Sequence, residues 1–329
     1  MRTGITLTFT NPPQWRRPWT EMWNEQVGWL VEAERDGLDC AWIPEHFFTD
    51  NGFGPSMPMI LTLLIERTQR MRIGSDIYIL PQHHAAQLAQ ETATLDQLSG
   101  GRLSVGVGLG HRLAEYRAFG IDRRDRRSLR EEGLDVLKLA WTTRPFSYSG
   151  RHYQLDGVEV YPEPFQRPHP PLWVAATTAP AAARAGRHGA HLQAASIDPD
   201  VYAAYRQGLS DGGHETGGAR VGNSFRFHLT RQDPRKVFER NRDAVAYAMQ
   251  FYSDIRAELG DPPLHVSDLE SSAWFGDPDT ILGMLKPYVE QFGLTDLVWS
   301  GPVSGVDPAD ARESLRLFGE EVLPVLKTW

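Results

Sequence analysis

The chain has 329 residues, a single cysteine (Cys40), and 34 basic against 42 acidic side chains, which give a net charge of −8. The single cysteine excludes an internal disulfide and fits a reducing, cytoplasmic location, and the acidic balance argues against a surface for nucleic acid or an anionic membrane. No apolar run reaches the roughly 20 residues of a membrane span, the first residues lack a signal-peptide pattern, and the length suits one α/β barrel with insertions.

Short apolar runs recur along the chain and predict β-strands. Several of them are apolar at consecutive positions, which is typical of parallel strands that are covered on both faces. The predicted strands are residues 4–9, 40–43, 72–80, 103–108, 172–176, 191–195, 224–229 and 296–300.

Longer stretches with helical spacing lie between these runs. Residues 21–37, for example, put Trp23, Val27 and Leu30 on one face and end at Gly37, a plausible helix cap. About eight strands that alternate with helices predict a (β/α)8 TIM barrel, with a doubly wound open sheet as the alternative. The other predicted helices lie within residues 85–102, 130–141, 179–189, 234–252, 278–293 and 309–326.

Two stretches interrupt the alternation of strands and helices. Residues 145–171 are rich in proline and have hairpin character in places, and residues 251–277 form a long polar stretch. Loops of this length in a compact domain are usually lids or binding loops. We therefore expect residues 1–329 to form one barrel domain with insertions after the fourth and the seventh strand.

Small and polar residues gather where the predicted strands end. The active site of a (β/α)8 barrel lies at the carboxyl ends of its strands, so this convergence is what a cofactor or substrate site would produce. The residues are Glu45 and His46 after the second strand, Asp76, His83 and His84 in or after the third, Gly108 and His111 at or after the end of the fourth, and Ala176, Thr177 and Thr178 at the fifth.

Each of these residues also has a purely structural interpretation. The glycines of residues 106–110 lack the spacing of the dinucleotide fingerprint, so no NAD site is predicted. His83 and His84 have no third ligand at metal-binding spacing, so no metal site is predicted. The two threonines fit either a simple helix cap or a phosphate site, and the basic run 123–130 fits either a solvated helix start or an arginine that completes that site.

Four segments carry a resemblance to a known family. They are residues 73–110, 119–141, 170–189 and 314–326, and they occur in the order that the family has. Through them the chain resembles the luciferase-like flavin monooxygenases, a (β/α)8 family that includes bacterial luciferase and alkanesulfonate monooxygenase. The resemblance implies that a reduced flavin, FMN, lies across the carboxyl ends of the barrel strands.

The resemblance also implies which residues hold the flavin. We expect its phosphate near the fifth strand and the following helix, and its ring against the end of the third strand. The matching residues are Arg127, Ala176, Thr177 and Thr178 for the phosphate, a cis peptide bond between Asp76 and Ile77 against the ring, and Gly108 as a small residue that faces it.

Glu45 and His46 match the Glu-His pair of the family, with His46 at the position of the catalytic histidine. An imidazole moves protons near neutral pH, so we expect His46 to act as acid or base beside the flavin C4a, oriented by Glu45 or a nearby backbone group. Phe47 stands where some members carry a second histidine, so the role of that histidine is not carried over. The candidates on the substrate side are Phe47, His84, His111 and Trp274.

The implied activity is that of a two-component monooxygenase. A separate NAD(P)H:flavin reductase supplies FMNH2, which activates O2 as a flavin C4a-(hydro)peroxide and oxygenates a small organic substrate. One alternative is an F420-dependent oxidoreductase of the same superfamily, and another is a flavin-binding subunit without catalysis; the Glu45–His46 pair favours FMN. Because members of the family commonly form dimers, we expect a homodimer or a higher homo-oligomer.

Overall fold

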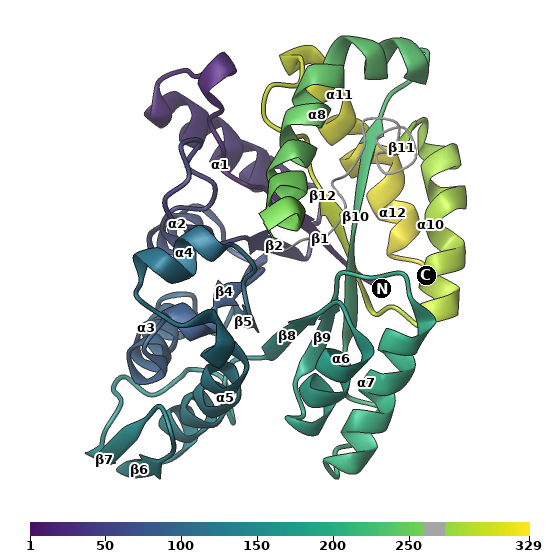
Figure 1. Ribbon diagram of the computed structural model, residues 1–329. Coiled ribbons are helices and arrows are strands. Elements are labelled where there is room, and N and C mark those ends of the chain that lie inside the picture. Colours follow the sequence, from purple (N-terminus) through teal and green to yellow (C-terminus); the bar gives the residue numbers. More distant parts are fainter. Residues whose placement is uncertain (259–273) are drawn as a thin grey trace. The chain divides into compact units, whose positions relative to one another are not determined.

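The computed structural model of the chain describes residues 1–258 and 274–329 (Figure 1). These residues form two compact units. Unit 1 consists of Met1–Trp42, His46–Pro55 and Arg220–Trp329, and unit 2 consists of Ile43–Glu45 and Ser56–Ala219. No helix within the described ranges is long and apolar enough to cross a membrane.

The core of unit 1 is a parallel β-sheet with the strand order β11, β10, β12, β1, β2. The register places Ile5 of β1 between Trp299 of β12 and Ala41 of β2, and all three side chains are buried. The strands are β1 (Arg2–Thr6), β2 (Cys40–Ile43), β10 (Val221–Leu229), β11 (Trp274–Gly276) and β12 (Asp296–Ser300). The helices are α1 (Trp19–Arg35), α8 (Pro234–Glu258), α10 (Pro278–Phe292), α11 (Pro308–Leu317) and α12 (Leu323–Leu326), with short helical turns at Pro13–Trp15 and Phe318–Val322.

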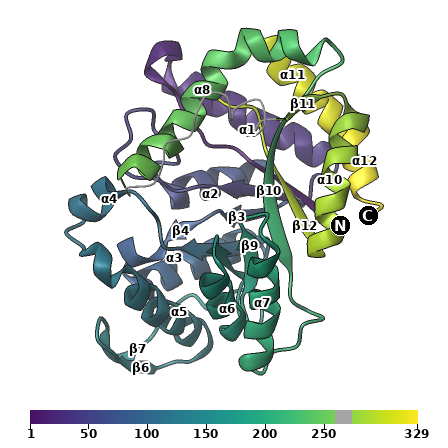
Figure 2. The ribbon, with the colours of Figure 1, turned by 45° about the vertical axis from the view of Figure 1, so that its right-hand side comes forward.

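In unit 2, the parallel strand β5 pairs with β3, β4 and β8, and β8 pairs with β9. Its helices α6 and α7 lie side by side in both views (Figures 1 and 2). The strands are β3 (Arg72–Ser75), β4 (Tyr78–Ile79), β5 (Leu103–Gly108), β8 (Leu172–Ala176) and β9 (His191–Ala194). The helices are α2 (Met57–Arg67), α3 (Ala85–Leu98), α4 (Leu113–Ala118), α5 (Arg126–Thr142), α6 (Ala179–Arg187) and α7 (Pro199–Asp211), with short 3-10 turns at Leu80–Gln82 and Arg123–Asp125.

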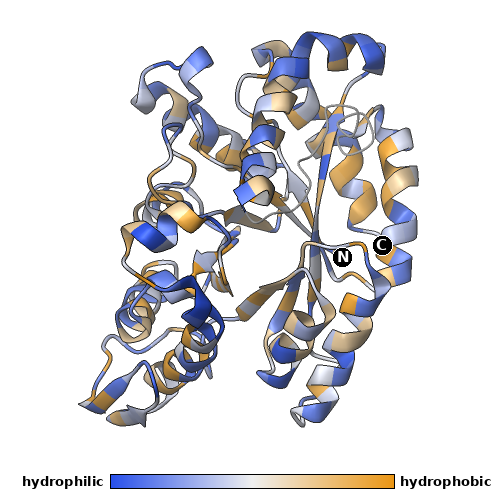
Figure 3. Cartoon of the chain, viewed as in Figure 1, coloured by the Kyte–Doolittle hydropathy of each residue, from blue (hydrophilic) through white to orange (hydrophobic). Residues whose placement is uncertain are grey.

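The helices of both units carry hydrophobic and hydrophilic residues in alternation, as amphipathic helices do (Figure 3). In α5, for example, Leu134, Leu137 and Trp141 are buried, and their spacing of three and four residues places them on one face. A face of this kind supplies the apolar surface that an amphipathic helix buries within its unit.

All eight predicted strands are present, and those at residues 40–43, 103–108, 172–176 and 296–300 have the predicted bounds. The predicted strand 72–80 is divided into β3 and β4. Helices α2, α4 and α7 and strand β11 lie outside the predicted elements. The three residues of β11 are too few to show a period, and α4, with six residues, is almost as short. The sequence of α2 is apolar on most positions, so it lacks the amphipathic spacing that identifies a surface helix.

The two interruptions of the alternation have different structures. Residues 145–171 contain an antiparallel hairpin, formed by β6 (Phe146–Ser149) and β7 (Gln154–Val158). Residues 251–277 begin as helix, because α8 continues to Glu258 with Ile255 buried, and they end in β11. The expectation of a loop is therefore wrong at both ends of this stretch, and residues 259–273 lie outside the described residues.

Candidate active site

The third predicted strand is interrupted at the residues that the resemblance places against the flavin ring. β3 ends at Ser75, and the peptide bond between Asp76 and Ile77 is cis, as expected. A Cβ atom on Gly106 would lie 2.1 Å from the Ser75 carbonyl oxygen, and one on Gly108 would lie 2.6 Å from Ile77 Cδ1. The space beside Gly108 is therefore occupied by Ile77, so packing explains this glycine without a ligand.

Asp76 lies between β3 and β4, and its carboxyl group faces Gln193 of β9, with Gln193 Nε2 at 3.4 Å from Asp76 Oδ2. Burial raises the pKa of Asp76 to about 6, and the hydrogen bond from Gln193 lowers it only in part. A carboxyl group that changes charge near neutral pH at the ends of strands is a candidate for a functional site. The sequence analysis missed Gln193, although a glutamine inside the apolar run 191–195 was the available signal.

The residues expected at the phosphate lie at the beginnings of two helices. Ala176 is buried at the end of β8, and the exposed Thr177 and Thr178 lead into α6, where the Thr178 side chain makes no capping hydrogen bond. Arg127 is exposed in the first turn of α5. The N–H groups at such a helix start attract anions through the helix dipole.

Two further arginines interact with the start of α5 or lie in it: Arg130 of α5, and Arg184 in the last turn of α6. Burial lowers the pKa of Arg184, and the positive charges of Arg130 and Arg127 lower it as well, so these guanidinium groups act on one another. Arg130 is buried, its Nη2 lies 2.6 Å from Glu131 Oε1, and its Nη1 has no hydrogen-bond partner among the described residues. Burial alone would raise the pKa of Glu131, but hydrogen bonds from His188 and Arg130 lower it to about 2. We call Arg127, Arg130 and Arg184 the arginine group; the sequence analysis singled out Arg127 alone.

Glu45 holds the segment that follows the cis peptide bond. Its side chain is buried, and its Oε2 accepts hydrogen bonds from the Ile79 backbone N–H at 2.8 Å and from His83 Nε2 at 2.8 Å. Both contacts lie within unit 2 and involve a residue of β4 or the loop after it. These contacts give Glu45 two partners that the sequence analysis, which expected it to orient His46, did not indicate.

His46 lies in the loop after β2, and its ring packs against two aromatic rings of unit 1. It is 6% exposed, and the centroid of its ring lies 4.7 Å from that of Phe53 and 4.9 Å from that of Phe251. The two phenyl rings are 5.0 Å apart, so the three rings form one cluster. The loop is joined to the segment after β1 by a hydrogen bond from the Gly54 N–H to the Thr8 carbonyl oxygen at 3.0 Å. The sequence analysis did not single out Phe251, which lies at the end of the predicted helix 234–252 and at the start of the stretch 251–277.

The candidates on the substrate side differ in their surroundings. His111 and Phe47 are half-buried in loops after strands. Trp274 lies in β11, and its ring stacks at 5.9 Å on both Phe225 and Tyr288. These contacts explain Trp274 by packing within unit 1, which is the commoner fate of a large aromatic residue.

The adjacent histidines after β4 have different partners. His83 bonds to Glu45, whereas the exposed His84 packs its ring edge-on against Tyr153 at 5.4 Å. Within residues 1–258 and 274–329, the His, Cys, Asp and Glu side chains form no group of three or more that could hold a metal ion.

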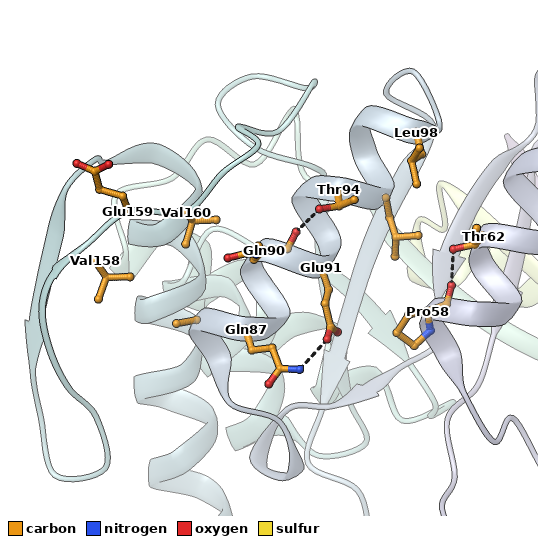
Figure 4. A pocket seen from close by; sticks show the side chains of 12 residues that line it. Pro58, Thr62, Gln87, Gln90, Glu91, Thr94, Leu98, Val158, Glu159 and Val160 are labelled. Atoms are coloured by element: carbon orange, nitrogen blue, oxygen red, sulfur yellow. Dashed lines mark hydrogen bonds between the residues drawn. The ribbon is translucent and has the colours of Figure 1, made fainter.

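A groove on the surface of unit 2 lies between α2, α3 and the segment after β7 (Figure 4). Its volume is about 550 Å³, and it is lined by side chains such as Thr62, Gln87, Glu91 and Val160. None of the predicted site residues lines this groove, so it is distinct from the candidate active site.

A profile of the luciferase-like monooxygenase family matches residues 1–282. The chain is 28% identical to the F420-dependent glucose-6-phosphate dehydrogenase of Amycolatopsis mediterranei over 92% of this chain and 94% of the relative. It is also 28% identical to the 4-hydroxyprotoasukamycin monooxygenase of Streptomyces nodosus, over 93% and 87%. The match to the uncharacterized protein y4wF of Sinorhizobium fredii, at 34% identity, spans about half of each chain, 55%. Relatives named for an activity are thus oxidoreductases, which supports the prediction of an oxidoreductase enzyme.

Solved structures of similar fold cover the whole chain. The monooxygenase RslO1 of Streptomyces bottropensis has a TM-score of 0.87 at 24% identity, with 99% of this chain and all of that chain covered. The oxygenating constituent of 3,6-diketocamphane monooxygenase of Pseudomonas putida, solved in complex with FMN, has a TM-score of 0.81 at 19% identity, with 98% of each chain covered. These likenesses confirm the predicted fold class, a (β/α)8 barrel.

Proposed function

The chain belongs to the luciferase-like monooxygenase family, and we propose that it is a monooxygenase that uses reduced FMN and O2 to oxygenate a small organic substrate. The observation that carries the proposal is the arginine group, in which Arg127 and Arg130 of α5 act electrostatically on Arg184 in the last turn of α6. A phosphate carries close to two negative charges at neutral pH, and a bound FMN would bring it there. F420-dependent hydride transfer is the second candidate, because an F420-dependent relative aligns over 92% of this chain.

The phosphate site combines three favourable features. Thr177 and Thr178 are exposed at the start of α6 and offer hydroxyl and backbone donors. Arg127 lies in the first turn of α5, and the buried Arg130 has a guanidinium nitrogen with no partner among the described residues. Hydrogen bonds from arginine to phosphate are charge-assisted and about twice as strong as neutral ones.

The flavin ring is assigned to the end of β3, beside Asp76 and Ile77. When bound, a reduced flavin supplies the electrons that activate O2. Asp76, with a pKa of about 6, offers a carboxyl group that gains or loses a proton near neutral pH. His46 is assigned the acid–base role, and the phenyl rings of Phe53 and Phe251 limit the access of water to its imidazole.

The partners follow from the same assignment. A separate NAD(P)H:flavin reductase would supply the reduced FMN, since the chain lacks a dinucleotide fingerprint and a similar structure is the oxygenating constituent of a monooxygenase. We assign the enzyme to the cytoplasm and infer a homodimer. Met59 and Leu98, at 74% and 60% exposure, form an apolar edge on α2 and α3 that suits such an interface.

The test is an anaerobic titration of the purified protein with reduced FMN and, in parallel, with reduced F420, followed by the admission of air. We expect tight binding of reduced FMN and a transient absorbance change after O2 is added. Preference for reduced F420, with no oxygen-dependent signal, would move the protein to the hydride-transfer class. A protein that binds neither reduced cofactor would overturn both candidates.

A further inference from the structure

Two stretches of unit 2 are joined by a pair of hydrogen bonds on either side of the cis peptide bond. The Asp76 N–H donates to the Ile43 carbonyl oxygen at 2.7 Å, and the Ile79 N–H donates to Glu45 Oε2 at 2.8 Å. Residues 43–45 therefore hold residues 76–79 at both ends. The first bond uses only main-chain atoms, whereas the second depends on the Glu45 side chain.

The partner of the Glu45 carboxylate is His83, which carries a positive charge when it is protonated. The Glu45 Oε2–His83 Nε2 distance is 2.8 Å, and the exposed fractions of the two side chains are 2% and 19%. Burial by itself would lower the pKa of His83, but the hydrogen bond and negative charge of Glu45, together with the charge of Glu91, raise it above its ordinary value. His83 is therefore more readily protonated than an ordinary histidine.

Other titratable groups near this pair are Tyr78, Glu91 and Tyr153, and none of them supplies a positive charge. Tyr78 of β4 packs edge-on against His83 at 5.4 Å, and burial with the charges of Glu45 and Glu91 raises the pKa of Tyr78 well above its usual range, so its hydroxyl stays neutral. Glu91 lies on α3, and the Tyr153 hydroxyl donates to the His83 carbonyl oxygen at 3.5 Å. A neutral His83 would leave the buried Glu45 carboxylate with less compensation, which is costly at such a site.

We propose that Glu45 and His83 form a partly buried ion pair that keeps residues 76–79 in the arrangement that binds the flavin, and that loss of the His83 proton loosens this arrangement. Glu45 and His83 are positioning residues here, because neither is assigned to touch the reacting atoms. The inference rests on the proposed function, in which Asp76 and Ile77 face the flavin ring. It predicts that flavin affinity falls as the pH rises through the pKa of His83.

The first experiment measures the affinity for reduced FMN from pH 6 to pH 9 in the wild type and in the His83→Arg and His83→Gln variants. Arginine keeps a positive charge at every pH, so the affinity of His83→Arg should match the wild type at pH 6 and exceed it at least threefold at pH 9. His83→Gln should bind about tenfold more weakly than the wild type at pH 6. The FMN phosphate and Asp76 also titrate near pH 6, but they do so in every variant, so the ratio of affinities isolates His83.

A matched control is His169→Gln. His169 is another half-buried histidine of unit 2, and it packs against Trp141 at 5.3 Å. This variant should keep the pH profile of the wild type. Identical pH profiles for the wild type and His83→Arg, or equal weakening in His83→Gln and His169→Gln, would overturn the inference.

The second experiment needs no flavin and uses the histidine NMR signals of the protein alone. The His83 signal, assigned from its loss in His83→Gln, should titrate above the ordinary histidine range in the wild type and lower in Glu45→Gln. A His83 signal with an ordinary pKa in the wild type would overturn the ion pair itself. If the protein binds no reduced FMN but His83 titrates as expected, the proposed function fails and the flavin link fails with it, while the ion pair stands.

Discussion

The two units each place one histidine, His228 in unit 1 and His83 in unit 2, in opposite environments. In unit 1, His228 of β10 stacks on Phe275 at 4.9 Å, and burial lowers its pKa to about 4 despite the charges of Asp310 and Glu313. In unit 2, the carboxylate of Glu45 outweighs burial and raises the pKa of His83. The same residue type is therefore kept neutral among aromatic rings and favoured as a cation beside a carboxylate.

This difference extends to the candidate site residues that each unit contains by itself. The His46 cluster of unit 1 contains phenyl rings, whereas the site residues of unit 2 include carboxyl groups, guanidinium groups and an exposed helix start. A charged cofactor phosphate needs charged and hydrogen-bonding groups around it. A proton-transfer residue that must be shielded from water needs apolar rings around it. Sequence motifs alone did not separate these two tasks, because Glu45 and His46 are neighbours in the chain yet contact different groups.

The largest expected effect is that of His46→Asn. If His46 is the acid or base, the rate of product formation with a substrate found by screening should fall roughly 100- to 10,000-fold. The affinity for reduced FMN should change by no more than about threefold, since the charged groups of unit 2 are untouched. His169→Asn serves as the control for the loss of a half-buried imidazole, and an active His46→Asn enzyme would remove the catalytic assignment.

The second prediction concerns His228, the histidine among aromatic rings, and the pH dependence of the free energy of unfolding. The unfolded chain binds a proton at His228 near its ordinary pKa of about 6.5, whereas the folded chain does so only near pH 4. The free energy of unfolding should therefore decrease by roughly 3 kcal/mol as the pH falls from 7 to 4. His228→Phe should remove this part of the acid sensitivity in urea unfolding experiments; an unchanged pH dependence would mean that His228 is charged or rearranged in the folded protein.

The smallest expected effect concerns Arg127, one of the charged site residues of unit 2. Arg127→Gln should weaken the binding of reduced FMN by about tenfold, which corresponds to roughly 1.4 kcal/mol for one charge-assisted interaction. Reduced riboflavin, which has no phosphate, should bind equally well to the variant and the wild type. Arg124→Gln is the control, because Arg124 is exposed and pairs with Asp122. Equal weakening for both flavins would argue that Arg127 acts on the fold or the ring instead of the phosphate.

The strands and most helices were predictable because they follow from local patterns. Residues 103–108 and 172–176 are apolar at consecutive positions, as a strand buried on both faces requires, and their bounds were predicted without error. The end of α8 was missed because most residues after Phe251 are polar and show no apolar helical spacing. Ile255 is the buried residue that continues this spacing. The cis bond at Asp76–Ile77 came from the family resemblance and has no local signal in the sequence.

The sequence by itself determined where eight strands lie and the bounds of four of them, and it indicated His46, Asp76 and Arg127 as site candidates. The tertiary structure decided which groups come together: Glu45 bonds to the Ile79 N–H and to His83, and His46 packs on Phe251. It also brought Arg184 within electrostatic reach of Arg127 and Arg130. The physical reason is that periodic patterns report how one element buries its own surface. Hydrogen bonds and ring contacts between distant elements depend on the register and packing of the whole unit, which no local pattern encodes.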